Sequence, residues 1–221
     1  DVLADIMAVT GCSEEVAWKM IYRGGLTIHS TENSVLQQIC EDEANNPDLY
    51  STDAQVSMVV IDTQTGQVTA MVGGRGQKTA SLILNSATSE PRQPGSTINI
   101  IGEYAAALDK GEITLGTIFD DAPYTYSDGT EVQNSDGSYG GFTTVRSAIV
   151  KSNNIVALET FQKMGIDAVW NELNNFGIST LTDNDLVEAL ALGGLTNGVT
   201  NLELTAAYAA IANKGIYYNP I

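Results

Sequence analysis

The alternation of apolar and polar positions along the chain predicts a protein of mixed α and β structure. Apolar side chains recur at helical spacing over residues 2–20 and 35–43, while residues 26–30 alternate between apolar and polar side chains as a short strand does. A polar Asn-Asn-Pro-Asp run then interrupts the pattern. We therefore expect a linker module over residues 1–50 and a larger domain over residues 51–221.

The clearest β pattern is a hairpin over residues 56–72. Two apolar runs flank an Asp-Thr-Gln-Thr-Gly turn, and Gly66 can supply the left-handed backbone conformation that such turns require. Both runs are apolar enough to lie in a sheet covered by helices. The glycine-rich residues 73–76 lack the Lys-Ser/Thr of a P-loop and the third glycine of a dinucleotide fingerprint, so we expect a plain turn there.

The later half of the chain is predicted to be mostly helical. Apolar residues share one face over residues 98–108, Asp167 is expected to cap a second helix, and Thr200 begins a third with a capping box. Residues 120–141 are rich in Gly, Ser, Asp and Tyr and are interpreted as a long surface excursion, a kind of segment that is often functional. The fold class expected from these elements is α+β, with an antiparallel sheet flanked by helices.

Composition and charge narrow the classes of partner. Hydrophobic residues make up 43% of the chain and charged residues 17%, which favours a folded domain, and no apolar run approaches the roughly 18 residues of a membrane span. The net charge of −17 would repel nucleic acid, and no basic cluster could hold an anionic membrane surface. We therefore expect no nucleic acid partner, and membrane association only through an anchor that is not in this chain.

The two cysteines do not indicate a metal site. Cys12 and Cys40 form no Cys-x-x-Cys pair and have no neighbouring histidine, so no metal and no cofactor are expected. A disulfide between them and a pair of free thiols both remain open.

The Arg-Gln-Pro-Gly-Ser segment that ends at Ser96 has the pattern of a nucleophile at the start of a helix. The single histidine, His29, lies on the polar side of the predicted strand at 26–30 and is interpreted as solvent-facing, not as the base of a Ser-His-Asp triad. A lysine three residues after the serine would share its helix face and could accept its proton. That position is Asn99, whose amide is no useful base.

This segment, followed by Tyr-Ala-Ala-Ala-Leu, resembles the nucleophile segment of the penicillin-binding proteins, which are serine D,D-transpeptidases related to the serine β-lactamases. Residues 25–31 resemble the link between glycosyltransferase and transpeptidase in the bifunctional, class A members. The hairpin at 59–75 resembles the first hairpin of the transpeptidase sheet. Ser152 and Asn154 resemble the second motif, Ser-x-Asn, and residues 192–215 resemble the helical stretch before the third motif.

The resemblance implies a β-lactamase/transpeptidase-like fold, a site on the extracytoplasmic face of the bacterial membrane, and peptidoglycan stem peptides, β-lactams and other cell-wall synthesis proteins as partners. Ser96 would attack the penultimate D-Ala carbonyl, and Asn99 occupies the position of the general-base lysine. Ser152 would lie in the proton path to the leaving group, and Asn154 would hold the backbone of the substrate. Ser152 and Asn154 could equally be a helix end and the cap of the helix over residues 155–164.

Two departures from the family pattern bear on function. Asn99 replaces the lysine, and no Lys-Thr/Ser-Gly strand occurs before Ile221, so the sheet and cleft are expected to be incomplete at the C-terminus. Three hypotheses follow: an active transpeptidase with another proton acceptor, a catalytically degenerate module that binds peptidoglycan or partner proteins, and a portion of a larger enzyme that is compatible with either. The missing base favours an impaired enzyme.

Overall fold

A computed structural model describes residues 2–50, 52–80 and 83–221 and divides the chain into two compact units, Asp1–Thr31 and Glu32–Ile221. The first unit contains α1 (Val2–Thr10) and α2 (Glu14–Arg23), which pack on each other. The helical pattern over residues 2–20 is thus two helices, because Gly11 adopts a left-handed conformation with φ of 68° between them.

The strand expected over residues 26–30 is absent, and this prediction was wrong. Alternating side chains suit a pleated backbone, but a strand also requires a hydrogen-bonded neighbouring strand, which the sequence pattern does not reveal. His29 is exposed, as its polar position suggested. Cys12 and Cys40 are both free thiols.

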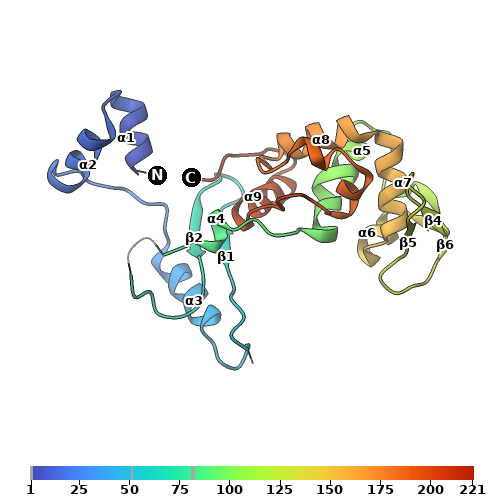
Figure 1. Ribbon diagram of the computed structural model, residues 1–221, viewed down its shortest axis with the longest axis horizontal. Coiled ribbons are helices and arrows are strands. Elements are labelled where there is room, and N and C mark those ends of the chain that lie inside the picture. The colour runs from blue at the N-terminus through green and yellow to red at the C-terminus, as the bar shows by residue number, and fades with distance from the viewer. Residues whose placement is uncertain (1, 51, 81–82) are drawn as a thin grey trace. The chain divides into compact units, whose positions relative to one another are not determined.

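The hairpin of the second unit is confirmed. Strands β1 (Met58–Ile61) and β2 (Val68–Val72) pair in antiparallel register, with Met58 opposite Val72. Helix α3 (Ser34–Ala44) packs on β2 and α9 (Asn201–Ala212) packs on β1 (Figure 1). The Gln37 side chain bonds both the N–H and the carbonyl of Met71, at 2.8 and 3.0 Å, so α3 satisfies backbone groups along the edge of β2.

The helix expected over residues 98–108 is not one regular helix, and the segment from residue 95 to residue 109 consists of three consecutive pieces. A 3₁₀ turn, η1 (Gly95–Thr97), leads into a π-turn, η2 (Ile100–Tyr104), and then into α5 (Ala105–Asp109). The backbone kinks at Gly102, where an added Cβ would lie 3.4 Å from Val169. The helix therefore changes its winding where it packs most closely on α8 (Ile166–Asn175).

The main core forms where this composite helix packs on α7 (Asn154–Met164), α8 and η4 (Glu188–Leu192). The other helical elements are α4 (Ser86–Ser89), α6 (Val145–Lys151) and η3 (Asp183–Asp185). Figure 1 shows α7 and α8 in orange tones beside the green segment that contains α5. The fully buried side chains at the centre include Ile98, Ile101, Leu158, Leu173 and Leu190. The start of the composite helix is thus packed against the core through Ile98 and Ile101.

The surface excursion over residues 120–141 contains ordered strands that its composition does not indicate. Strand β3 (Ile118–Asp121) pairs with β6 (Gly141–Thr144), and β4 (Tyr124–Thr125) pairs with β5 (Glu131–Val132). Buried side chains from this segment include Asp121 and Asn134. Their burial is tolerated because they form hydrogen bonds with each other and with nearby backbone groups. Such pairing arises only when the segment folds, so its composition does not reveal it.

Helix capping follows the sequence at α9 but not at α8. Thr200 Oγ accepts from the Glu203 N–H at 3.2 Å, and Glu203 Oε2 accepts from the Thr200 N–H at 3.0 Å, so the capping box is confirmed. Gly165, and not Asp167, is the N-cap of α8, and Asp167 lies in the first turn. Within the described ranges, no helix combines the length and apolarity needed to cross a membrane.

Candidate active site

The segment before Ser96 is held by the loop that follows η4. Arg92 and Val199 exchange two backbone hydrogen bonds of 2.8 Å. The Gln93 side chain bonds both backbone groups of Leu195, accepting from its N–H at 2.8 Å and donating to its carbonyl. Four hydrogen bonds therefore fix the direction from which the chain enters the turn at Ser96.

A close approach of two glycines completes this clamp. Gly193 has φ of 74°, and a Cβ added to it would lie 2.3 Å from the Gly95 carbonyl oxygen. Gly95 itself has φ of 55°. Both positions require backbone that other residues rarely adopt, and the contact leaves no room for a side chain.

We expect Gly193→Ala to destabilise the protein by about 2–4 kcal/mol, because it adds both backbone strain and a collision with the turn at Ser96. Gly111→Ala is the matched control, since Gly111 has φ of 69° but an added Cβ would meet nothing within 4 Å. That control should lose only about 1 kcal/mol. Denaturant unfolding of the two variants measures the difference, and equal losses would contradict the proposed contact.

The structure brings three of the four predicted site residues to one cavity of about 290 Å³. Ser96, Asn99 and Ser152 line it, together with Tyr104, Asn153 and Tyr208 among others. Ser96 is exposed at the turn, whereas Asn99 is only 3% exposed. The cavity thus lies where the composite helix faces the junction of α6 and α7.

The amide nitrogen of Asn99 donates to backbone carbonyls. With the amide oriented to satisfy its neighbours, its Nδ2 donates to the carbonyl oxygens of Ser96 at 3.2 Å and Ala191 at 3.0 Å. These bonds connect the turn at Ser96 to η4. Among the described residues that line the cavity there is no Lys, His, Asp or Glu, so none of them is a strong proton acceptor.

Ser152 ends α6 in a left-handed conformation, with φ of 53° and ψ of 51°. This conformation is costly for a residue with a side chain, but the N–H groups of Ser152 and Asn153 bond carbonyls in the last turn of α6 and hold it. Asn153 then caps α7, accepting from the Val156 N–H at 2.9 Å. The cap is therefore Asn153 and not Asn154.

The Asn154 side chain points away from the cavity that the other three predicted residues line. Its Nδ2 donates to the Gln133 carbonyl at 2.8 Å, and it does not line the cavity. Its role as a substrate ligand stays a prediction.

Asn134 is a supporting residue that sequence reasoning missed. Its Oδ1 accepts from the Asn154 N–H at 2.9 Å, and its Nδ2 donates to Asp121 Oδ1 at 2.7 Å. The second oxygen of Asp121 accepts from the Gly140 N–H at 2.7 Å. This buried network holds the start of α7, and an Asn within a polar segment gives no sequence signal for it.

Tyr208 fixes the turn from α9. Its hydroxyl donates to the Thr97 carbonyl at 2.8 Å, and burial raises its pKa, so the phenol stays neutral. It is thus a hydrogen-bond donor in the cavity wall and not a base.

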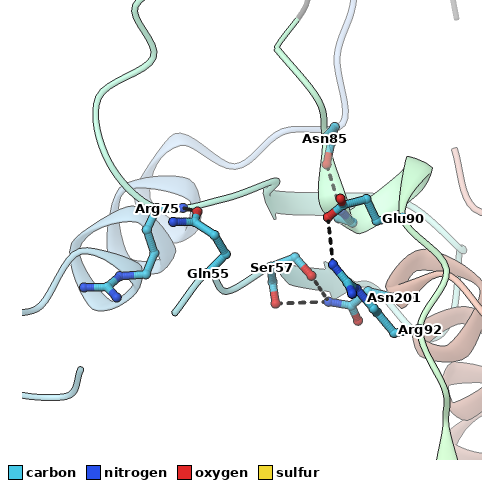
Figure 2. Close-up of polar contacts among 8 residues, drawn as sticks. Gln55, Ser57, Arg75, Asn85, Glu90, Arg92 and Asn201 are labelled. Carbon is cyan, nitrogen blue, oxygen red and sulfur yellow. Dashed lines mark hydrogen bonds and ion pairs between the residues drawn. The ribbon is translucent and has the colours of Figure 1, made fainter. Parts of the chain in front are cut away.

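A second cavity, of about 320 Å³, adjoins the same segment, and Figure 2 shows the contacts that build it. Asn201 from α9 points at Ser57 and donates to its carbonyl and hydroxyl oxygens, both at 3.1 Å. Glu90 pairs with Arg92 at 3.6 Å. The first contact links α9 to the residues that precede the hairpin, and the second lies within the segment that leads to Ser96.

The glycine-rich residues 73–76 form a turn, as expected. The Arg75 N–H donates to Gln55 at 3.0 Å, and its guanidinium donates to the carbonyls of Ala44, Thr52 and Ala54. The arginine therefore serves local structure.

The family described as the penicillin binding protein transpeptidase domain matches residues 56–221. The chain belongs to this family. Its curated relatives include penicillin-binding protein 1A/1B of Bacillus subtilis, 33% identical over 199 residues, and penicillin-binding protein 1A of Streptococcus oralis, 33% identical over 206 residues. Both alignments cover 89% of this chain but only 21% and 32% of those proteins. The chain thus spans about a fifth to a third of the length of these relatives.

Solved structures agree with the transpeptidase assignment and with the α+β class. The penicillin-binding protein PonA1 from Mycobacterium tuberculosis aligns with a TM-score of 0.80 at 23% identity, covering 99% of this chain and 57% of that chain. Penicillin-binding protein 1A from Haemophilus influenzae aligns with a TM-score of 0.68 at 32% identity, covering 76% and 25%. The first likeness concerns the fold alone.

Proposed function

We propose that this chain carries the acyl-serine nucleophile, Ser96, of a peptidoglycan D,D-transpeptidase domain, and that its acylation is impaired by Asn99. The observation that supports this most is the single cavity lined by Ser96, Asn99 and Ser152, without a strong proton acceptor among its described lining residues. Family membership supplies the reaction class, and the cavity supplies the reason for slow turnover.

In this proposal the Ser96 hydroxyl attacks the penultimate D-Ala carbonyl of a stem peptide, or the carbonyl of a β-lactam, and its backbone N–H donates to the oxyanion. Ser152 lies in the proton path to the leaving group. Asn99 holds the backbone around Ser96 but cannot accept its proton at neutral pH. General-base catalysis typically contributes about 10²–10⁴-fold to the rate, so most of the acylation rate is lost without it. The geometry around Ser96 is kept.

The proposed substrates and setting follow from family membership. A PonA1 structure whose fold is similar to this chain was determined in complex with penicillin V. We infer that β-lactams and peptidoglycan stem peptides are the ligands here, at the extracytoplasmic face of the bacterial membrane, with other cell-wall synthesis proteins as further partners.

A catalytically degenerate module that binds peptidoglycan or partner proteins is the second candidate. The amide at position 99 favours it, because two hydrogen bonds to backbone carbonyls give that side chain a structural purpose independent of catalysis. Both candidates keep the fold and differ only in whether Ser96 is acylated.

Incubation with a fluorescent penicillin, followed by intact-mass spectrometry, tests the proposal. We expect a slow, incomplete adduct on Ser96 and none in the Ser96→Ala control. Rapid stoichiometric labelling of Ser96 would show that another base serves and would contradict the impairment. Complete absence of an adduct, with saturable penicillin binding, would favour the binding module.

A further inference from the structure

The hairpin of β4 and β5 and the end of α7 line a further cavity, which the proposed function does not use. Its volume is about 760 Å³, compared with about 290 and 320 Å³ for the two cavities beside Ser96. Figure 1 shows β4 and β5 beside α7. The start of α8 and the segment that joins η3 to η4 complete its wall. Ligand sites typically have volumes of about 300–1,000 Å³, so a ligand of the size of a short peptide would fit.

Glu188 connects three of the elements that line this cavity. Its Oε2 accepts from the backbone N–H and the hydroxyl of Ser127, both at 2.8 Å, and Ser127 lies in the turn between β4 and β5. Its Oε1 accepts from the Gln162 side chain of α7. Hydrogen bonds within the chain therefore hold the walls in place, and a ligand would not have to order them.

The charge in this cavity is negative and is not compensated. Asp128 and Glu188 line it, and its described lining residues include no Lys, Arg or His. The three donors to Glu188 are neutral groups, so its charge remains, and a carboxylate can accept about one donor more than these three. Burial raises the pKa of Tyr126, and the charges of Glu188 and Asp128 raise that pKa further. The cavity therefore attracts cations.

Apolar side chains form much of the remaining lining. Phe161 is buried, and Tyr126 and Ile166 are half-buried. Leu186 and Val187 also line the cavity although they are 42% and 48% exposed. Burial of such exposed aliphatic surface against an apolar partner is favourable. The lining thus suits a ligand that carries both positive charge and bulky apolar groups.

We propose that this cavity binds an extended segment of a partner protein in which basic residues alternate with bulky apolar ones. Glu188 and Asp128 would contact the basic side chains, and Leu186 and Val187 would contact the apolar ones. A second copy of this chain is not the expected occupant, because a protein with a net charge of −17 repels itself. The inference goes beyond the proposed function, since it does not depend on acylation of the nucleophile.

Fluorescence anisotropy with three labelled pentapeptides tests the proposal. The probe Lys-Leu-Lys-Phe-Lys combines both chemistries, Lys-Ser-Lys-Ser-Lys keeps only the positive charge, and Glu-Leu-Glu-Phe-Glu reverses the charge. We expect the first probe to bind at least about tenfold more tightly than either of the others, because each of those lacks one of the two contributions.

Two substitutions in the cavity test the role of charge. Glu188→Gln should weaken binding of the first probe about tenfold, and Asp128→Asn about two- to fivefold, because Asp128 is the more exposed of the two acids. Asp128→Asn keeps an oxygen for the Thr130 N–H, which now donates to Asp128 Oδ1 at 2.8 Å, so the turn should be unchanged. The matched control is Asp53→Asn at an exposed position that does not line the cavity, and it should change binding less than about twofold.

Val187→Ser tests the apolar contribution and should weaken binding of the first probe about fivefold. Its matched control is Val150→Ser, because Val150 is 80% exposed on α6 and does not line the cavity. This control should bind as the native protein does. If Glu188→Gln does not fold, Asp128→Asn and Val187→Ser still decide the result, since both change exposed side chains.

Equal binding of Lys-Leu-Lys-Phe-Lys and Lys-Ser-Lys-Ser-Lys would overturn the proposal, because the net charge alone would then explain the attraction. Binding that the cavity substitutions leave unchanged would overturn it too. So would displacement of the first probe by an equal concentration of spermidine, which would indicate a site for small cations. Ser96→Ala should bind the probe as the native protein does, so a failure of peptide binding and a failure of penicillin labelling are separate results.

Discussion

Asn99→Lys is expected to raise the rate at which a fluorescent penicillin labels Ser96 by about 10²–10⁴-fold, in protein that carries a Lys-Thr/Ser-Gly strand. The physical reason is that a buried amine can be deprotonated near neutral pH and accept the hydroxyl proton, whereas an amide cannot. The turn at Ser96 and the left-handed Ser152 are already in place around the cavity. The substitution therefore adds a proton acceptor to a cavity in which Ser96 and Ser152 are already positioned.

The control for this experiment is Asn99→Met, which has similar length and no base and should label as slowly as the native protein. Stopped-flow fluorescence gives the rate, and peptide mapping locates the adduct. A folded Asn99→Lys protein that labels no faster would mean that the cleft has degenerated beyond this position, and the binding-module function would then be preferred.

The native protein is expected to lose stability as the pH rises and Glu103 ionises, and Glu103→Gln is expected to lack this pH-dependent loss. The folded-state pKa of Glu103 is raised above its unfolded value, so this group stabilises the fold fully below the unfolded pKa, and the contribution is lost as the pH rises toward the folded pKa. A glutamine does not ionise in either state. The difference between the two proteins should therefore grow with pH.

The expected size is about 1–3 kcal/mol in favour of Glu103→Gln between pH 5 and pH 7, since one proton contributes up to about 1.4 kcal/mol per pH unit. Urea unfolding at several pH values measures it. Asp185 and Glu203 have lowered pKa values and act in the opposite direction, but both proteins contain them and their effect cancels. A pH-independent difference would show that Glu103 already has a partner.

Most of the contacts that fix the backbone around Ser96 do not involve the side chain at position 99. Gln93, Gly193 and the Arg92–Val199 pair fix the turn at Ser96 through contacts that do not involve residue 99. Asn99 adds two bonds of its own to the same backbone. A side chain can therefore change the chemistry at this position while the turn keeps its shape.

The features that depend on neighbouring residues along the chain could be predicted from the sequence. The hairpin over residues 56–72 could be predicted because apolar runs and a turn glycine are local signals. The Thr200 capping box and the family resemblance around Ser96 are likewise local patterns. The strand at 26–30 and the cap at Asp167 failed because a local pattern permits an element without requiring it.

Which polar groups contact each other depends on how distant segments pack in the folded protein. Asn134 reaches Asp121 and the start of α7 across the excursion, and the η4 loop returns to clamp Gln93 about a hundred residues away in sequence. Glu103 reads in the sequence as an ordinary helix residue, yet the structure buries it completely. The free-energy cost of burying a charge or an unpaired donor depends on the groups that pack around it. Those groups come from segments that are distant in sequence, so a local sequence pattern does not predict them.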